Sequence, residues 1–530
     1  MTLDNPPRNK LRLISCLIWV FTLGISDSLP GTLLPRIEAY YNISYSVVST
    51  IWLANALGFI IIAILSHRLE HFLGKRIMIA GGCATSIIMY IFVAPGYKFP
   101  MVVVGFFFGG LGLATCLSEL NIFLSRFKKS SKYLGFFHGF YGLGACIGPI
   151  ISTVMIDHGI QWNYVYCILI GLTVVNIFDQ WFAFKNADED LKPFDNPDAN
   201  EDSTVTTPTS EDDKELGLNN NQEQQNDDSH HHHHHNLLPS SRLSVEVSSI
   251  LSDGSGTKKL TSDPIEMGIF SQKTMIAHPD LQKIPTHATH TTHNTHAATD
   301  SNNIINNVDG GLAPESSESA PLVSESPEKL LGLALRSPIT WFISFFVLFY
   351  QGGEVSIGGW IVTFLETYRH GDERTTGYVA SGFWGGLTIG RIFLTSFLHK
   401  NVGAKRGVSI LSLCAIASVI LAWVVPIIIV EAVFISICGI FIGPIYPLMI
   451  TVAVRILPRK IQIVSLTIMT AFGSSGGALF PFLVGIISQF AGTYIVFPVF
   501  IALFCAMLVL WYLLPNPDRN IIKHFWERVW

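Results

Sequence analysis

The chain has 530 residues, of which 49% are hydrophobic and only 14% are charged, and its mean hydropathy is +0.41. Soluble domains carry about 25% charged residues, so this composition argues against a soluble enzyme, a secreted disulfide scaffold and a nucleic-acid-binding protein. The net charge of −5 also hides an uneven distribution. Residues 185–330 hold 25 acidic and 9 basic side chains, whereas the remaining 384 residues hold 14 acidic and 25 basic ones.

Apolar runs of membrane-spanning length dominate the sequence on both sides of that acidic segment. About 20 apolar residues in a helix cross the ~30 Å hydrocarbon core of a bilayer. The sequence therefore predicts an all-α membrane protein with twelve transmembrane helices, which we expect to be a monomer in the lipid bilayer. The predicted spans are about 11–35, 46–67, 75–95, 100–125, 132–156, 163–184, 337–367, 378–399, 405–425, 430–456, 461–488 and 494–514.

Lys and Arg residues between the spans are concentrated on one side of the predicted membrane. With the central linker and its flanks left out, nineteen lie on the side that carries both termini, and four lie on the other side, namely Arg36, Lys98, Arg369 and Arg374. Because short loops rich in Lys and Arg stay in the cytoplasm, we expect a multi-pass protein with both termini cytoplasmic. The plasma membrane is the favoured location, and a vacuolar or other internal membrane is the alternative.

The two sets of six spans match each other at a nearly constant offset. Asp27-x-x-x-Gly31 matches Glu354-x-x-x-Gly358 at an offset of 327, and two further matches follow at offsets of 330 and 332. Such internal repeats are typical of transporters that bind their substrate between two related halves. We therefore expect two six-helix pseudo-repeats joined by a cytoplasmic linker, with boundaries at 1–184, 185–330 and 331–530.

The predicted linker is rich in Asn, Asp, Ser, Thr and His and poor in aromatic residues, a composition that favours disorder. It contains six consecutive histidines, His230–His235, and five more between 278 and 296. Histidine-rich loops can bind zinc, but a low-complexity tract in an unfolded loop has the same appearance. No cysteine accompanies these histidines, so we assign no metal site and expect no cofactor.

Several membrane segments carry a recognisable pattern of Gly, Pro and charged residues. They read GISDSLPGTLLP at 24–35, FHGFYGLGACIGP at 137–149, GGEVSIGGW at 352–360, WGGLTIGR at 384–391 and GPIYP at 443–447. With these segments the chain resembles the major facilitator superfamily, in particular its fucose-permease-like branch and the fungal bypass-of-stop-codon membrane proteins. The resemblance implies the twelve-helix fold of that superfamily and secondary transport. The family signature between spans 2 and 3 is incomplete here, because its Asp is missing and its spacing is longer.

Charged residues deep inside a span are functional candidates, because each costs about 2.5–3.5 kcal/mol at the bilayer centre on insertion scales. Asp27 and Glu354 sit at matching depths of about 24 and 25 Å along their spans, and Glu354 and Arg391 lie equally far from the outer ends. We expect Arg391 to hold an anionic or hydroxylated substrate and Glu354 to bind the coupling proton. The alternative for this pair is a static salt bridge. Asp27 is either a second proton or substrate site, or an acceptor for unwound backbone beside Pro30 and Gly31.

A second tier of candidates is weaker. Glu119 and His138 could form an inner-gate pair or a plain packing contact. Polar side chains that could contact the substrate are Asn55, Asn121 and Gln351. Aromatic side chains that could stack on a sugar-like face are Tyr141, Trp360, Trp384 and Tyr446, and for each of these helix packing is the competing interpretation.

These observations predict a secondary carrier that works by alternating access and couples the uptake of a small polar solute, such as a sugar, to protons. One alternative is a non-transporting nutrient sensor that keeps the carrier fold and signals through the linker. The other is a metal transporter regulated by its histidine-rich linker. The sequence contains no nucleotide-binding motif and no nucleophile elbow, so we expect neither catalytic residues, enzyme activity nor nucleic-acid binding.

Overall fold

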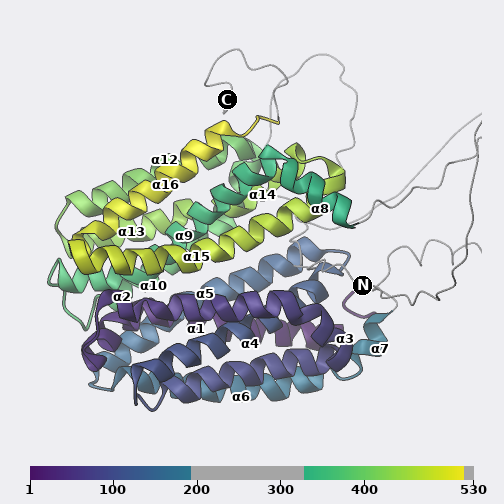
Figure 1. Cartoon of the computed structure of the whole chain (residues 1–530), viewed down its shortest axis with the longest axis horizontal. Coiled ribbons are helices and arrows are strands. Elements are labelled where there is room, and N and C mark those ends of the chain that lie inside the picture. Colours follow the sequence, from purple (N-terminus) through teal and green to yellow (C-terminus); the bar gives the residue numbers. More distant parts are fainter. Residues whose placement is uncertain (193–326, 518–530) are drawn as a thin grey trace, which may run out of the picture. The chain divides into compact units, whose positions relative to one another are not determined.

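The computed structural model describes residues 1–192 and 327–517 (Figure 1). All regular elements in this part of the chain are helices. The histidine run His230–His235 and most of the predicted linker lie outside the described residues. The prediction that the linker is disordered therefore stays a prediction over that range.

The first half of the chain forms six membrane-spanning segments. They are built from α1 (Asn9–Tyr41), α2 (Tyr45–Val48), α3 (Thr50–Val93), α4 (Phe99–Ser125), α5 (Ser130–Asp157), η1 (Trp162–Tyr164) and α6 (Val165–Ala183). The long α3 is two spans that meet at Gly74, whose backbone has φ 74° and ψ 163°. Only glycine adopts this positive φ without strain, so Gly74 makes the tight reversal between spans 2 and 3.

The second half repeats the arrangement. Its elements are α9 (Pro338–Thr367), α10 (Gly377–Ile389), η4 (Gly390–Leu394), α11 (Thr395–Asn401), α12 (Ala404–Val424), α13 (Ile428–Ile442), α14 (Ile445–Ile456), η5 (Arg459–Ile461), α15 (Gln462–Ala491), η6 (Thr493–Ile495) and α16 (Val496–Leu513). Here η4 is a π-helix, whereas η1, η5 and η6 are 3-10 helices.

The number of spans agrees with the expectation. Eleven segments of the described residues are long and apolar enough to cross a membrane. The twelfth, which runs from α10 through η4 to α11, is divided by the π-helix into pieces of 13, 5 and 7 residues. The predicted all-α fold of two six-helix pseudo-repeats is thereby confirmed.

Two short helices occupy the ends of the segment predicted as linker, and there the expectation of disordered chain is wrong. In α7 (Ala187–Leu191), Asp188 accepts a hydrogen bond from the backbone N–H of Lys75 at 2.7 Å, and Asp190 pairs with the fully buried Arg12. At the other end, α8 (Pro327–Arg336) leads into α9. The composition of the whole linker concealed these ends, because few residues make the tertiary contacts that order them.

The helices before residue 193 and those after residue 326 form two groups that meet along α1, α5, α9 and α10 and also along α2, α3 and α15 (Figure 1). A close approach between the groups involves Gly31 on α1 and Gly358 on α9, which are matching positions of the two pseudo-repeats. A Cβ atom added to Gly31 would lie 2.0 Å from the carbonyl oxygen of Gly358. Glycine at the crossing thus lets the two backbones touch, as small residues do between membrane helices.

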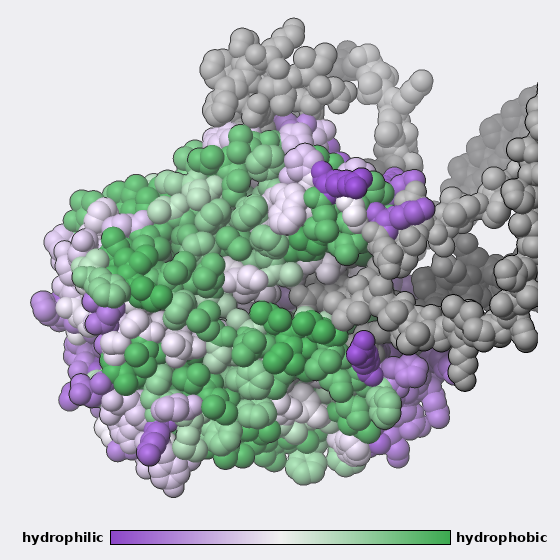
Figure 2. All heavy atoms as spheres, in the orientation of Figure 1, coloured by the Kyte–Doolittle hydropathy of each residue, from purple (hydrophilic) through white to green (hydrophobic). Residues whose placement is uncertain are grey.

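Hydrophobic side chains cover the middle of the visible face, and hydrophilic ones gather toward its two ends (Figure 2). Many large apolar residues are exposed, for example Phe393 and Ile429, the latter with 75% of its surface accessible. Such extensive apolar exposure is unusual for a soluble protein but expected where lipid is the solvent.

Candidate functional site

Glu354 and Arg391 form an ion pair in the interior of the second half. Glu354 lies on α9 with only 6% of its surface exposed, and Arg391 lies in the π-helix η4. The Nη2 atom of Arg391 donates to both carboxylate oxygens of Glu354, at 2.9 and 3.0 Å. The structure thus brings together the two residues that were matched by depth, although their role in transport stays a prediction.

Tyr350 completes this cluster, and the sequence analysis missed it. Its hydroxyl accepts a hydrogen bond from Arg391 at 3.3 Å and donates one to the carbonyl of Ile442 at 3.2 Å. Tyr350 precedes Glu354 by four residues, so the two side chains lie on the same face of α9. This spacing of four residues could have identified Tyr350 from the sequence. The predicted candidate Tyr446 stacks beside Tyr350, with ring centroids 6.0 Å apart.

The π-helix positions Arg391. A π-helical turn contains an extra residue and is often found at functional sites. The backbone of Gly390 packs against Ile440, where a Cβ atom would lie 2.1 Å from the carbonyl oxygen. The Nε atom of Arg391 then donates to the carbonyl of Gly443 at 3.4 Å. Because residues 390 and 443 are glycines, the end of α10 and the end of α13 approach closely enough for Arg391 to reach the carbonyl of Gly443.

Asp27 lies on α1 and accepts a hydrogen bond from the hydroxyl of Tyr141 on α5, at 3.2 Å. The alternative interpretation, in which Asp27 accepts from unwound backbone, is wrong because α1 remains helical through Pro30 and Gly31. The predicted candidate Tyr141 is also close enough to Glu354 and Arg391 to interact with them electrostatically. Tyr141 therefore bonds a charged residue of the first half and senses the charges of the second.

Glu119 and His138 are not brought together as an inner-gate pair, since no hydrogen bond or ion pair joins them. Glu119 is buried on α4, where its charged neighbours include Lys75 and Arg126. His138 on α5 instead has Arg391 as its charged neighbour. Glu119 and His138 lie a similar number of residues from the loop between α4 and α5, but their side chains are close to different charged residues.

The polar candidates occupy different surroundings. Asn55 is half-buried on α3, where its backbone contacts Gly110 of α4. Asn121 keeps a buried side-chain oxygen without a hydrogen-bond partner. Gln351 precedes the Glu354 cluster on α9 and packs against Gly473 of α15. Of these three, Asn121 has an unmet acceptor and Gln351 lies next to the charged cluster.

Two of the aromatic candidates are packing residues by their contacts. Trp360 is fully buried, and its indole N–H donates to the carbonyl of Pro481 at 2.9 Å. Its ring also contacts Tyr45 and Trp52 of the first half. Trp384 lies with its ring against Gly358, although its indole nitrogen is buried without a partner. These contacts favour helix packing over substrate stacking.

The end of the molecule at which α1, α5 and α9 finish is closed by polar contacts between the halves. Arg36 forms ion pairs with Glu366 and Glu373, both at 2.7 Å. Arg374 lies 3.7 Å from Asp157. We call these five residues the closed-end cluster.

Helix α2 and the following turn continue this closure. The backbone N–H of Tyr45 donates to the side chain of Gln489 at 2.9 Å, and the hydroxyl of Ser49 contacts the carbonyl of Phe482 at 3.5 Å. These contacts join the entry to the second span with α15 of the other half. Together with the closed-end cluster, they hold the two halves against each other at this end.

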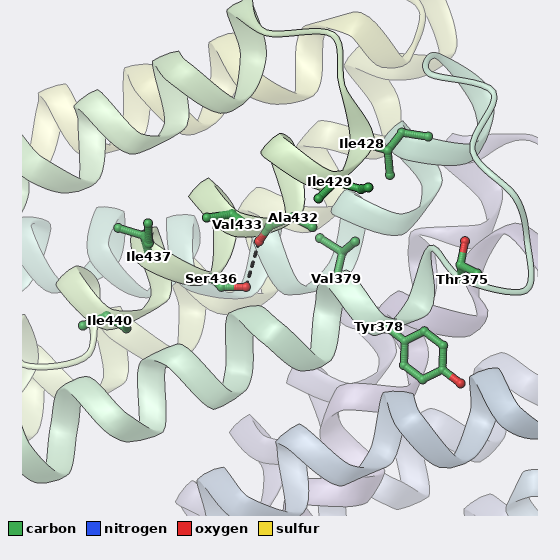
Figure 3. A pocket seen from close by; sticks show the side chains of 10 residues that line it. All are labelled: Thr375, Tyr378, Val379, Ile428, Ile429, Ala432, Val433, Ser436, Ile437 and Ile440. Carbon is green, nitrogen blue, oxygen red and sulfur yellow. Dashed lines mark hydrogen bonds between the residues drawn. The ribbon is translucent and has the colours of Figure 1, made fainter.

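A groove of about 460 Å³ lies between α10 and α13 (Figure 3). Its wall is mostly aliphatic, with the polar side chains of Thr375, Tyr378 and Ser436, and Ser436 bonds the carbonyl of Ala432 at 2.8 Å. It contains none of the predicted site residues. An aliphatic surface of this kind suits lipid better than a polar solute, so we do not place the substrate there.

Comparison with known proteins agrees with this architecture. The sequence profile of the family described as Major Facilitator Superfamily matches residues 16–460 and 343–528. Bypass of stop codon protein 6 of Saccharomyces cerevisiae is 22% identical over 500 residues, which cover 92% of this chain and 78% of the relative.

Solved structures share the fold at low sequence identity. A bacterial homolog of the human lysosomal transporter Spinster, in an inward-facing and unoccupied conformation, superposes with a TM-score of 0.60 at 12% identity and covers 99% of both chains. The fucose:proton symporter of E. coli superposes with a TM-score of 0.48 at 12% identity, over 94% of this chain and 98% of its own. On the extent of the profile match and the twelve-helix fold, the chain is a multi-pass membrane protein that belongs to the Major Facilitator Superfamily.

Proposed function

We propose that this chain, whose fold and family support a secondary transporter of small solutes, moves a small polar solute, such as a sugar, by alternating access and couples the movement to protons. The observation that carries the proposal is the Glu354–Arg391 pair, buried among membrane helices with Tyr350 beside it. Asp27 and Tyr141 supply the matching groups from the first half.

The Glu354–Arg391 pair can couple protonation directly to substrate binding. Ionised Glu354 holds the Nη2 atom of Arg391 through both carboxylate oxygens, so this nitrogen is occupied and the positive charge of the guanidinium is compensated. Protonation removes that negative charge and frees the guanidinium to donate to a hydroxyl or carboxylate oxygen of the solute. An unpaired charge inside a membrane is costly. Proton uptake therefore favours solute binding, and solute release restores the ion pair.

The closed-end cluster indicates the conformational state. We propose that both termini are cytoplasmic, since Lys and Arg residues concentrate on their side of the membrane. The cluster around Arg36 then lies at the outer face. Closure at that face with ion pairs of 2.7 Å is what an inward-facing state of the carrier requires.

Glu354→Gln separates coupling from transport. Purified protein in proteoliposomes is screened with candidate solutes under an imposed pH gradient. The wild type is expected to accumulate the solute, whereas Glu354→Gln loses proton-driven accumulation and retains exchange of internal for external solute. Arg391→Ala is expected to lose both activities, because the donor to the solute is gone.

Glu189→Gln is the matched control, since it makes the same acid-to-amide change at an exposed position of α7. It should behave as the wild type. Accumulation that responds to the pH gradient as strongly in Glu354→Gln as in the wild type would rule out the proton role. A complete absence of uptake for all solutes, with the wild type folded, would favour the sensor interpretation.

A further inference from the structure

Helix α8 presents leucines to the outside just before the chain enters the membrane. Leu331 and Leu335 are one helical turn apart and remain 43% and 42% exposed, while Ala334 between them is buried against the protein. Burying a leucine side chain is worth about 1.5–3 kcal/mol. Leu333 is exposed as well, at 45%, so the exposed leucines of this ten-residue helix call for an apolar environment outside the protein.

The exposed leucines of α8 continue into a surface that faces lipid. The indole N–H of Trp341, near the start of α9, donates to the carbonyl of Leu335 at 2.8 Å. The rings of Trp341, Phe345 and Phe472 form a cluster with centroids 5.4 to 6.2 Å apart, and Phe345 is itself exposed on the membrane-spanning α9. Tryptophan is enriched at the boundary between hydrocarbon and headgroups. The leucines thus meet the bilayer at its surface.

Basic side chains surround the same helix. Lys329 and Arg336 are exposed on α8, and α8 contacts η5, which carries the exposed Arg459 and Lys460. By sequence, α8 has two bases against one acid, Glu328, and so carries one positive charge in excess, and the basic side chains of η5 lie beside it. An amphipathic helix with this combination lies in the membrane interface and is attracted to anionic lipids.

We infer that α8 and η5 form a binding surface for anionic phospholipid headgroups, with Leu331 and Leu335 inserted among the acyl chains of the adjacent leaflet. Continuity with the aromatic cluster of α9 and α15 selects a bilayer over a soluble protein partner. The surface anchors the chain where it returns from the central segment to the membrane. It does not depend on which solute is carried or on proton coupling.

Hydrogen–deuterium exchange of full-length protein in nanodiscs measures this directly. The discs contain phosphatidylcholine alone or phosphatidylcholine mixed with phosphatidylserine, and the readout is amide protection in α8. Each basic side chain near an anionic surface contributes about fivefold in affinity, so Lys329 and Arg336 together give up to about thirtyfold higher protection in the anionic discs. Lys329→Gln with Arg336→Gln should abolish that difference and leave the protection in neutral discs.

Two further double variants complete the design. Lys128→Gln with Lys129→Gln removes the same charge from exposed positions between α4 and α5, and should keep the lipid-dependent difference. Leu331→Ser with Leu335→Ser should lower protection in both types of disc, because insertion is lost. Equal protection of wild-type α8 in neutral and anionic discs overturns the inference, as does an equal loss in the two charge variants. Thermal unfolding of each variant in detergent confirms that it is folded.

Discussion

At the scale of single residues, the deciding feature is how each buried charge is compensated. Arg391 has an acidic partner, a tyrosine hydroxyl and a backbone carbonyl within reach. Lys405 is more deeply buried than Arg391, with 2% of its surface exposed, and it donates to the carbonyls of Trp511 and Leu514 at the end of a helix. The two carbonyl partners of Lys405 cannot be protonated, so these contacts are structural. Arg391 is paired with an acid that can be protonated, so its pair can exist in a closed and an open state.

Tyr350→Phe is expected to weaken transport without unfolding the protein. The change removes a hydroxyl that bonds Arg391 and Ile442, and a hydrogen bond to a charged group contributes about 1.5–3 kcal/mol. Solute affinity or turnover should fall by roughly tenfold or more, measured as initial uptake rates in proteoliposomes. Tyr164→Phe, at an exposed position of η1, should transport as the wild type. Unchanged kinetics for Tyr350→Phe would show that the hydroxyl has no part in the site.

At the scale of elements, glycines set how closely helices approach. The crossing of α1 and α9 depends on Gly31, because a Cβ there would meet the backbone of Gly358 at 2.0 Å. A backbone carbonyl cannot move aside as a flexible side chain can. The same crossing fixes the distance between Asp27 and Glu354, each one turn away from its glycine.

Gly31→Ala should therefore lower the melting temperature and reduce transport. Gly81→Ala is the matched control on α3, where an added Cβ has no atom within 4 Å. Alanine is favoured over glycine in a helix by about 1 kcal/mol, so Gly81→Ala should be neutral or slightly stabilising. Thermal unfolding in detergent compares the two variants. Equal melting temperatures of Gly31→Ala and Gly81→Ala would show that α1 and α9 can move apart without a loss of stability.

At the scale of the whole molecule, the two halves are held together at one end by the closed-end cluster. Arg36 is the centre of this cluster, since it pairs with both Glu366 and Glu373. Arg36 and Glu366 are mostly buried, with 16% and 10% of their side chains exposed. Removing one partner of such a pair leaves the other charge uncompensated, which favours separation of the halves.

Arg36→Glu is expected to shift the equilibrium away from the closed-end state and to slow the transport cycle. A change of about 1.4 kcal/mol in that equilibrium alters the ratio of states tenfold. The double variant Arg36→Glu with Glu366→Arg restores opposite charges and should recover most of the lost activity. Uptake by both variants in proteoliposomes checks this expectation. Failure of the double variant to improve on Arg36→Glu would assign the defect to folding or to other contacts of Arg36.

The sequence by itself determined the twelve spans, their repeat and the depth of Asp27, Glu354 and Arg391, because hydrophobic runs and positions along a helix are local properties. Tertiary structure decided which of these residues meet. Contact between Glu354 and Arg391 depends on the rotation of α9 and α10 about their axes and on the π-helical turn at Gly390–Leu394. No local sequence pattern predicts the rotation or the π-helical turn. The rotation of α9 also brings Tyr350 into the cluster, and the rotations of α4 and α5 direct Glu119 and His138 to different charged groups. Lipid accepts many rotations of an apolar helix, and only packing against its neighbours selects one.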